Sequence, residues 1–444
     1  LRFSGNLHIH WRVCHRYCVM NTIQYLLRWN IVVMLLLGIT VSRVASLDFS
    51  YHNQNQLEIF LHNASFYYPD ITDLYSIGKS VHGVNLWVLA IGKDIKSHVP
   101  LRPNVKYIGN IHGNEAVSRE MMMHFIDYLL RSYGSNQTVT NFLNNTAVHV
   151  MVTMNPDGFN KSILGMCDGY IGRDNANGFD LNRNFPDFFK ENKSPVQLET
   201  HAVIEWIHNQ SFVLSANFHG GAMVANYPFD SYNSTSQTSG ASISPDDDVF
   251  QHLALTYTRS HASMSLSPVT CPGDHFVNGI TNGASWYTII GGMQDYNYLS
   301  VGCMEITIEM ACCKFPYPSQ LPQFWQKNKD ALFNFLTRVH IGAKGFVTDE
   351  NNNPLPSARV CVVGREPVHF RTSKYGEYWR LLLPGSYTLQ AEANGYLTTT
   401  VSIVVRDGVI TRQDIKLMKS GFSKGFKHAV HLPLLLLSLI MIFL

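Results

Sequence analysis

The chain has 444 residues, which suggests two or three domains, and its 45% of apolar residues supports a sizeable core. The formal net charge is +2 and the sequence contains no basic runs, which excludes an extended electrostatic surface for nucleic acid. Any charged ligand must therefore be recognised locally, within a pocket.

The N-terminal residues have the pattern of a secretion signal. Residues 1–19 precede the first methionine, Met20, and are interpreted as an upstream segment or a gene-model artefact. Residues 20–46 are predicted to be a cleaved signal peptide, because Arg28 is followed by an apolar core and then by small residues at 44–46. A membrane-spanning anchor is the alternative, but the apolar run is shorter than a bilayer requires.

The C-terminal residues resemble a signal for glycolipid attachment. Residues 419–444 combine small residues, a short polar spacer and the apolar run 432–444. A membrane-spanning tail is the alternative, and the shortness of this run disfavours it. We therefore expect the protein on the extracellular face of the plasma membrane, held by a glycolipid, and also in a released soluble form.

Sequons and cysteines agree with a secreted protein. Six cysteines follow the predicted signal peptide, and several should pair in an oxidising compartment, although the sequence alone does not give their connectivity. Cys303 lies in an apolar run and could equally be a free buried thiol. Seven Asn-x-Ser/Thr sequons support glycosylation; they begin at Asn63, Asn136, Asn144, Asn160, Asn192, Asn209 and Asn233.

Two domains are predicted between these ends. Residues 47–339 alternate helical and extended patterns, which predicts an α/β domain, and residues 340–418 alternate apolar and polar positions between turns, which predicts a small all-β sandwich. In open α/β sheets, functional sites collect at the carboxyl ends of strands. The predicted buried strands of the first domain are 86–91, 148–152, 212–216 and 303–308, and its predicted helices include 117–133 and 196–208.

Three residues at or just beyond predicted strands form a candidate metal site. His112 and Glu115 stand three residues apart, and His219 follows about a hundred residues later. Two histidines and one carboxylate are the ligand set of a catalytic zinc, which keeps one position open for water. A lone histidine is more often structural than a ligand, so the flanking motifs decide this interpretation.

Four further motifs accompany this trio. Arg173 precedes the run D-L-N-R-N-F-P at 180–186, and an arginine beside an asparagine amide suits a carboxylate ligand. The run G-G-M-Q-D-Y-N-Y at 291–298 has the composition of a mobile binding loop, and E-I-T-I-E at 305–309 precedes two adjacent cysteines. Within the last run, Glu305 is expected to be structural.

Together, these motifs resemble those of the zinc metallocarboxypeptidases, specifically the regulatory branch that acts on basic residues. The resemblance covers nearly all of the chain between the two targeting signals. It implies a mixed-sheet catalytic domain, a transthyretin-like β-sandwich, one Zn²⁺ per chain, and the disulfides Cys167–Cys313 and Cys271–Cys312. The implied residues are His112, Glu115 and His219 as zinc ligands, Glu309 as general base, Arg173 at the oxyanion, Asn182 and Arg183 on the substrate carboxylate, Tyr296 (in preference to Tyr298) closing over the substrate, and Asp230 selecting a basic residue.

The expected activity is the removal of C-terminal Arg or Lys from peptides and proteins at the cell surface, by a monomer with no nucleic-acid partner. Two alternatives come from other classes. A zinc amidohydrolase acting on small acylated amino acids would share the ligand pattern, but the Asn182–Arg183 pair favours peptides. A non-catalytic binding protein would have lost motif residues, and here each motif position is filled.

Overall fold

The computed structural model describes residues 46–232, 239–268, 271–368 and 370–420. The upstream segment, the predicted signal peptide up to residue 45, and the predicted anchor signal from residue 421 lie outside the described residues. The described residues from Phe49 onward belong to one compact unit. None of the helices in these ranges is long and apolar enough to cross a membrane.

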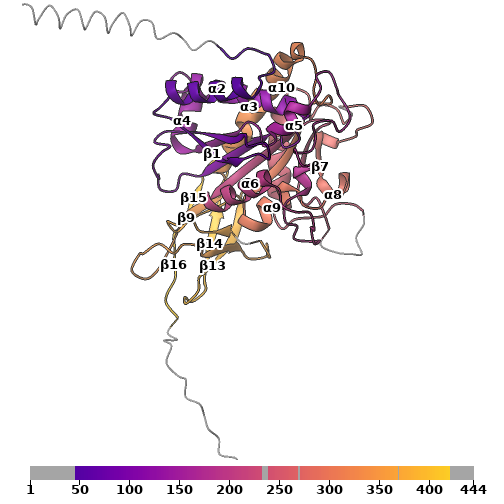
Figure 1. Cartoon of the computed structure of the whole chain (residues 1–444). Helices are drawn as coiled ribbons and strands as arrows, with labels where there is room; N and C mark the ends of the chain where they lie inside the picture. Colours follow the sequence, from indigo (N-terminus) through magenta and orange to yellow (C-terminus); the bar gives the residue numbers. More distant parts are fainter. Residues whose placement is uncertain (1–45, 233–238, 269–270, 369, 421–444) are drawn as a thin grey trace, which may run out of the picture. The chain divides into compact units, whose positions relative to one another are not determined.

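A mixed eight-stranded sheet forms the centre of the larger domain, as expected from the sequence (Figure 1). The strand order is β1-β2-β4-β3-β5-β8-β6-β7, and the run β4-β3-β5-β8 is parallel. The strands are β1 (Thr72–Lys79), β2 (Asn85–Ile91), β3 (Asn104–Gly109), β4 (Ala147–Met151), β5 (Phe212–His219), β6 (Met223–Tyr227), β7 (Ile280–Asn282) and β8 (Met304–Met310).

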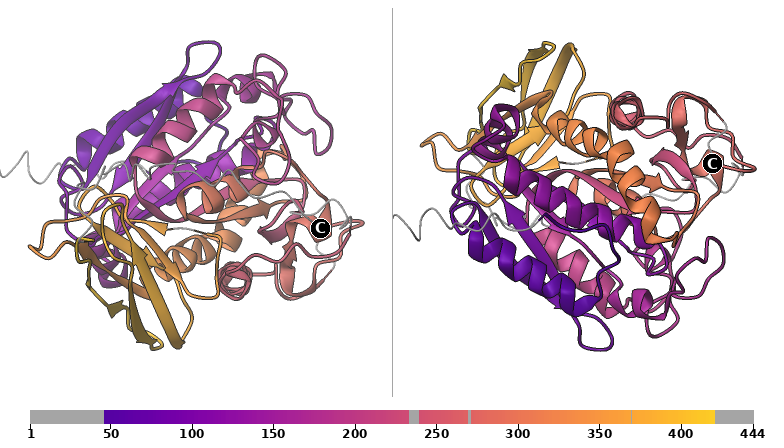
Figure 2. Two further views of the ribbon diagram at one scale, coloured as in Figure 1. Left: turned by 90° about the horizontal axis from the view of Figure 1, so that it is seen from below. Right: turned by 90° about the horizontal axis from the view of Figure 1, so that it is seen from above.

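Helices cover both faces of this sheet (Figure 2). Successive side chains of a strand point to opposite faces, and adjacent residues of β3 show the two layers. Tyr107 packs against Phe125 and Phe335 of α3 and α10, whereas Ile108 belongs to a core cluster with Trp206 of α6. The helices are α2 (Gln54–Tyr67), α3 (Ala116–Ser132), α4 (Gln137–Asn145), α5 (Pro156–Lys161), α6 (Leu198–Asn209), α7 (Asp247–Ser260), α8 (Gly283–Trp286), α9 (Met293–Tyr296) and α10 (Leu321–Thr337), with short helical turns η1 (Leu181–Arg183) and η3 (Asn297–Val301) near the site.

The parallel strands bring the predicted site residues to one edge of the sheet. Gly109, at the end of β3, pairs with Phe218 of β5, and the next residue of β5, His219, pairs with Glu309 of β8. The loop after β3 carries His112 and Glu115. The carboxyl ends of β3, β5 and β8 therefore meet where the sequence predicts the site.

Residues 343–416 form the predicted β-sandwich. One sheet has the order β11-β10-β13-β14, and the other has the order β12-β9-β15, with β16 also pairing with β9. Apolar side chains from both sheets, including Val347, Val360 and Leu389, form its core. The strands are β9 (Ala343–Thr348), β10 (Arg359–Val362), β11 (Phe370–Arg371), β12 (Glu377–Arg380), β13 (Gly385–Glu392), β14 (Thr399–Val405), β15 (Thr411–Arg412) and β16 (Ile415–Lys416).

A buried ion pair joins the sandwich to the catalytic domain. Arg380 Nη2 of β12 lies 2.6 Å and 2.8 Å from the two carboxylate oxygens of Asp246, which directly precedes α7. Both side chains are almost fully buried, and the Arg380 guanidinium also stacks on Phe370. Tyr298 of η3 donates its hydroxyl hydrogen to the same carboxylate at 2.7 Å. The sandwich is thus tied to the helical turn that follows α9.

We expect Arg380→Met to lower the free energy of unfolding by about 3 kcal/mol, near the lower end of the cost of breaking a buried pair, because Arg365, 2.8 Å from Asp246, still compensates part of the carboxylate charge. Arg412→Met is the matched control: Arg412 pairs with Asp414 at 2.7 Å, but both side chains are about half exposed, so its loss should cost about 1 kcal/mol or less. Urea unfolding of both variants measures the difference. Equal losses in the two variants would contradict the structural role of the buried pair.

Candidate active site

The loop between β3 and α3 presents the first two members of the histidine–glutamate trio. Asn110 adopts a left-handed conformation (φ 56°), and its Nδ2 donates to the carbonyls of His112 (2.8 Å) and Gly113 (2.9 Å). Gly113 packs directly against Gly158, where an added Cβ would lie 2.2 Å from backbone. The chain therefore turns sharply between the strand and α3, and Glu115 stands at the first turn of that helix.

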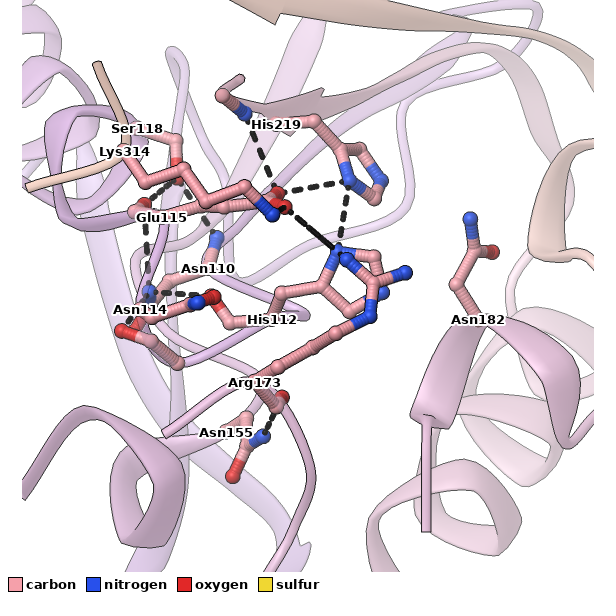
Figure 3. Close-up of polar contacts among 12 residues, drawn as sticks. Asn110, His112, Asn114, Glu115, Ser118, Asn155, Arg173, Asn182, His219 and Lys314 are labelled. Atoms are coloured by element: carbon pink, nitrogen blue, oxygen red, sulfur yellow. Dashed lines mark hydrogen bonds and ion pairs between the residues drawn. The ribbon is translucent and has the colours of Figure 1, made fainter. Parts of the chain in front are cut away.

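The trio converges at the end of β5 (Figure 3). Glu115 Oε1 lies 3.0 Å from His112 Nδ1, and its Oε2 lies 2.9 Å from His219 Nδ1. The two Nδ1 atoms are 3.1 Å apart, and all three side chains are buried. Burial lowers the pKa of His219 to about 4, so this imidazole is neutral at pH 7, as a metal ligand must be. Two imidazole nitrogens and a carboxylate aimed at one point fit the donor set of a zinc site.

Asp180 orients His112 and was not among the predicted site residues. Its Oδ1 accepts a hydrogen bond of 2.9 Å from His112 Nε2, which leaves Nδ1 to face Glu115 and His219. Burial alone would raise the pKa of Asp180, but the His112 imidazole and the Arg173 guanidinium hold it well below its usual range. A carboxylate on the outer nitrogen of a ligating histidine fixes the ring and raises its basicity.

Asp180→Asn should therefore weaken zinc binding by about 10–100-fold, because an amide holds the His112 ring less firmly than a carboxylate does. Competition against a chelator of known zinc affinity measures the change. Asp187→Asn serves as the control, since Asp187 accepts from the Gly291 N–H at 2.9 Å and touches none of the trio. Unaltered zinc affinity in the Asp180 variant would refute the orienting role.

Arg173 extends over the trio from the loop that follows α5. Its guanidinium donates to Asp180 Oδ2 at 2.8 Å and 3.0 Å, and Nη1 lies 3.4 Å from Glu115 Oε1. Figure 3 shows the guanidinium beside His112. Arg173 lines the pocket, so it places a fixed positive charge next to the point on which the trio converges.

Glu309 faces the same pocket from the end of β8. Burial, reinforced by the charge of Glu115, raises the pKa of this carboxyl well above its usual range, against the opposing effects of Lys314 and Arg173. Its Oε2 is buried and has no hydrogen-bond partner among the described residues. Glu309 is thus a carboxylate poised to take up a proton, as a general base must be.

The pocket also brings together the residues predicted to bind substrate. Asp180 accepts from the Asn182 N–H at 2.8 Å, which fixes the turn η1 on which Asn182 and Arg183 stand. Both residues line the pocket, as does Asp230 in the loop after β6. Asp230 is buried, and burial raises the pKa of its carboxyl to about 7 even though Asn226, Arg183 and Gln294 oppose this.

Two family models match this chain. The zinc carboxypeptidase model matches residues 57–331, and the carboxypeptidase regulatory-like domain model matches residues 342–418. Carboxypeptidase M of Mus musculus is 46% identical over 400 residues, which cover 90% of this chain and 88% of that protein. The chain belongs to the zinc carboxypeptidase family.

Other relatives agree with this assignment. Carboxypeptidase D of Homo sapiens is 45% identical over 84% of this chain, and the match spans 27% of that protein. The crystal structure of thrombin activatable fibrinolysis inhibitor has a TM-score of 0.52 at 18% identity, covering 68% of this chain and 77% of that one, which shows a likeness of fold alone. The chain is therefore a metallocarboxypeptidase, and the family implies zinc.

The structure of this zinc carboxypeptidase does not bring Tyr296 into the pocket. Tyr296 is buried against Phe185, and His208 Nε2 lies 3.0 Å from its hydroxyl. Tyr296 is not among the residues that line the pocket. Tyr298, the alternative, bonds to Asp246 instead. The pocket contains Tyr287, which is 50% exposed and stands in the run S-W-Y just before the glycine-led loop.

Other predictions about this zinc carboxypeptidase are confirmed. The disulfides Cys167–Cys313 and Cys271–Cys312 are present, and they attach two loops to the residues that follow β8. Cys303 is a free buried thiol. Glu305 is structural: its carboxylate lies 2.7 Å from the Lys106 ammonium, and both side chains are fully buried.

Proposed function

We propose that this zinc carboxypeptidase removes C-terminal Arg or Lys from peptides and proteins. The observation that carries the proposal is Asp230, a buried carboxylate that lines the pocket and forms no ion pair with another described residue. An incoming guanidinium or ammonium group supplies the missing partner. A neutral side chain would leave the carboxylate buried and unpaired, which discriminates strongly against other C-terminal residues.

Asn182 and Arg183 bind the terminal carboxylate in this proposal. Asn182 Oδ1 accepts the Met293 N–H at 2.9 Å, so its amide NH₂ group is the part left for a ligand. A guanidinium and an amide can both donate to one carboxylate, and hydrogen bonds to the charged group are the strong ones. A free α-carboxylate is present only at the end of a peptide, so this pair makes the enzyme an exopeptidase.

His112, Glu115 and His219 are the proposed zinc ligands. When bound, zinc lowers the pKa of coordinated water and polarises a carbonyl oxygen. Glu309 takes the proton from the attacking water and passes it to the leaving amine, a role that suits its raised pKa. Arg173 supplies positive charge where the oxyanion develops, an effect of about 3–4 kcal/mol per donor. Tyr287 replaces Tyr296 as the proposed aromatic residue over the bound substrate.

The proposed location is the outer face of the plasma membrane, with the protein held as a monomer by a glycolipid. Support for it comes from the sequence patterns at 20–46 and 419–444. Membrane attachment would confine the activity to peptides that arrive at the cell surface.

A pair of peptides tests the exopeptidase role. The peptides share one sequence ending in Arg, and one carries a free C-terminal carboxylate while the other carries an amide. We expect kcat/KM to be at least about 100-fold higher for the free acid, because the amide leaves the Arg183 guanidinium without its anionic partner. Equal cleavage of the two, or cleavage at internal bonds, would refute this part of the proposal.

A further inference from the structure

Asn192 begins one of the seven sequons, but its side chain already performs a structural task. Its Nδ2 donates to two backbone carbonyls of the clamp loop (residues 180–186): that of Arg183 at 3.0 Å and that of Phe185 at 2.8 Å. Its Oδ1 accepts the N–H of Ser194 at 3.1 Å. Both amide hydrogens and the oxygen of Asn192 are therefore engaged.

Gly291 packs onto the same amide. The Phe185 N–H donates to the Gly291 carbonyl at 3.0 Å, and a Cβ added to Gly291 would lie 2.3 Å from Asn192 Nδ2 and 2.8 Å from the Arg183 carbonyl oxygen. Two residues further on, the Met293 N–H donates to Asn182 Oδ1. The Asn192 amide thus lies at the junction between the clamp loop and the segment that holds the Asn182 side chain.

The other described sequons are arranged differently. Asn63, Asn160 and Asn209 are exposed. The side-chain oxygen of Asn136 accepts a hydrogen bond from the Thr138 N–H. The side-chain oxygen of Asn144 accepts one from the Tyr133 hydroxyl. Among the sequon asparagines in the described ranges, Asn192 is the one whose nitrogen donates twice into a backbone turn.

We propose that Asn192 is a positioning residue for the substrate-carboxylate clamp, and that the active enzyme carries no glycan on it despite the sequon. An N-linked sugar replaces one Nδ2 hydrogen and is bulky. One of the two bonds to the clamp loop would be lost, and the sugar would have to enter the space where Gly291 packs. The native clamp and a glycan on Asn192 therefore exclude each other. This inference rests on the proposed role of Arg183.

Two measurements on the full chain, secreted from mammalian cells, test the proposal. Glycopeptide mass spectrometry should find Asn192 unmodified in the active enzyme and glycans on exposed sites such as Asn63 and Asn209. Asn192→Asp keeps the side-chain shape but turns an oxygen toward the two carbonyls. We expect it to raise KM for a peptide ending in Arg by about tenfold or more, with kcat changed less than about threefold. Asn63→Gln removes an exposed sequon on α2, away from the clamp loop, and should leave both constants unchanged.

A glycan on Asn192 in catalytically active protein would overturn the proposal. So would a folded Asn192→Asp variant with an unaltered KM, or a variant whose kcat falls while KM stays constant. The mass-spectrometric result requires no variant, so it stands even if Asn192→Asp fails to fold. Failure of the proposed function is distinguishable, because the unmodified chain would then also fail to release C-terminal Arg.

Discussion

Glu309→Gln should lower kcat by about 10²–10⁴-fold while KM for a peptide ending in Arg changes little. Glutamine fills the same volume but cannot accept a proton from water or return it to the leaving amine. Burial and the charge of Glu115 raise the pKa of the wild-type carboxyl above its usual range, so Glu309 binds a proton more readily than an ordinary glutamate does. Steady-state kinetics with one peptide series measures both constants.

Two controls accompany the Glu309 variant. Its zinc content should equal that of the wild type, because Glu309 is not one of the three proposed ligands. Glu205→Gln makes the same chemical change at an exposed position of α6 and should leave kcat unaltered. A Glu309→Gln enzyme with nearly full kcat, or one that has lost its zinc, would contradict the assigned role.

Asp230→Asn should reduce kcat/KM for peptides ending in Arg or Lys by about 10²–10⁴-fold, in line with the roughly 3–5 kcal/mol that loss of one partner from a buried ion pair costs. Peptides ending in Phe should not lose activity, because they make no ion pair with this residue. The ratio of the Arg rate to the Phe rate is therefore the quantity to measure. A ratio that the substitution leaves unchanged would show that basic residues are selected elsewhere.

The same carboxyl sets an expected pH dependence. Burial raises the pKa of Asp230 to about 7, and only the ionised form attracts a cationic side chain. KM for Arg peptides should therefore fall as pH rises from 6 to 8, and this trend should be absent in Asp230→Asn. The free energy of unfolding changes in the opposite direction and falls as pH rises. The pKa of Asp230 in the folded enzyme exceeds its unfolded value of about 3.9, so ionisation of this carboxyl favours unfolding. Asp230→Asn should stabilise the enzyme above neutral pH.

Much of the fold was predictable because the relevant signals are local. Apolar runs bounded by turn residues mark the buried strands. His219 and Glu309 lie side by side because they end neighbouring parallel strands, whose carboxyl ends meet at one edge of the sheet. The change to period-two alternation after residue 340 marks the sandwich. The zinc trio was predictable because its flanking motifs, taken together, are specific. The roles of these residues stay predictions until the variants are measured.

What the sequence did not reveal about the site has a common physical origin. The run at 291–298 offers two tyrosines, and which ring faces a pocket depends on the path of the preceding loop, which periodicity does not report. Tyr287 therefore escaped prediction, and so did the Asp180–His112 contact, which joins residues 68 positions apart. The pairing of Asp246 with Arg380 crosses two domains. Likewise, the sequence reveals the sequon at Asn192 but not the hydrogen bonds that occupy its amide.

The zinc-dependent selection of basic residues is tested with four peptides that differ only in their last residue: Arg, Lys, Phe or Glu. Release of that residue is followed by mass spectrometry with the zinc-loaded enzyme, after chelation, and after zinc is returned. We expect rapid release of Arg and Lys alone, loss of both on chelation, and recovery with zinc. Comparable release of Phe or Glu, or release that survives removal of zinc, would contradict this expectation.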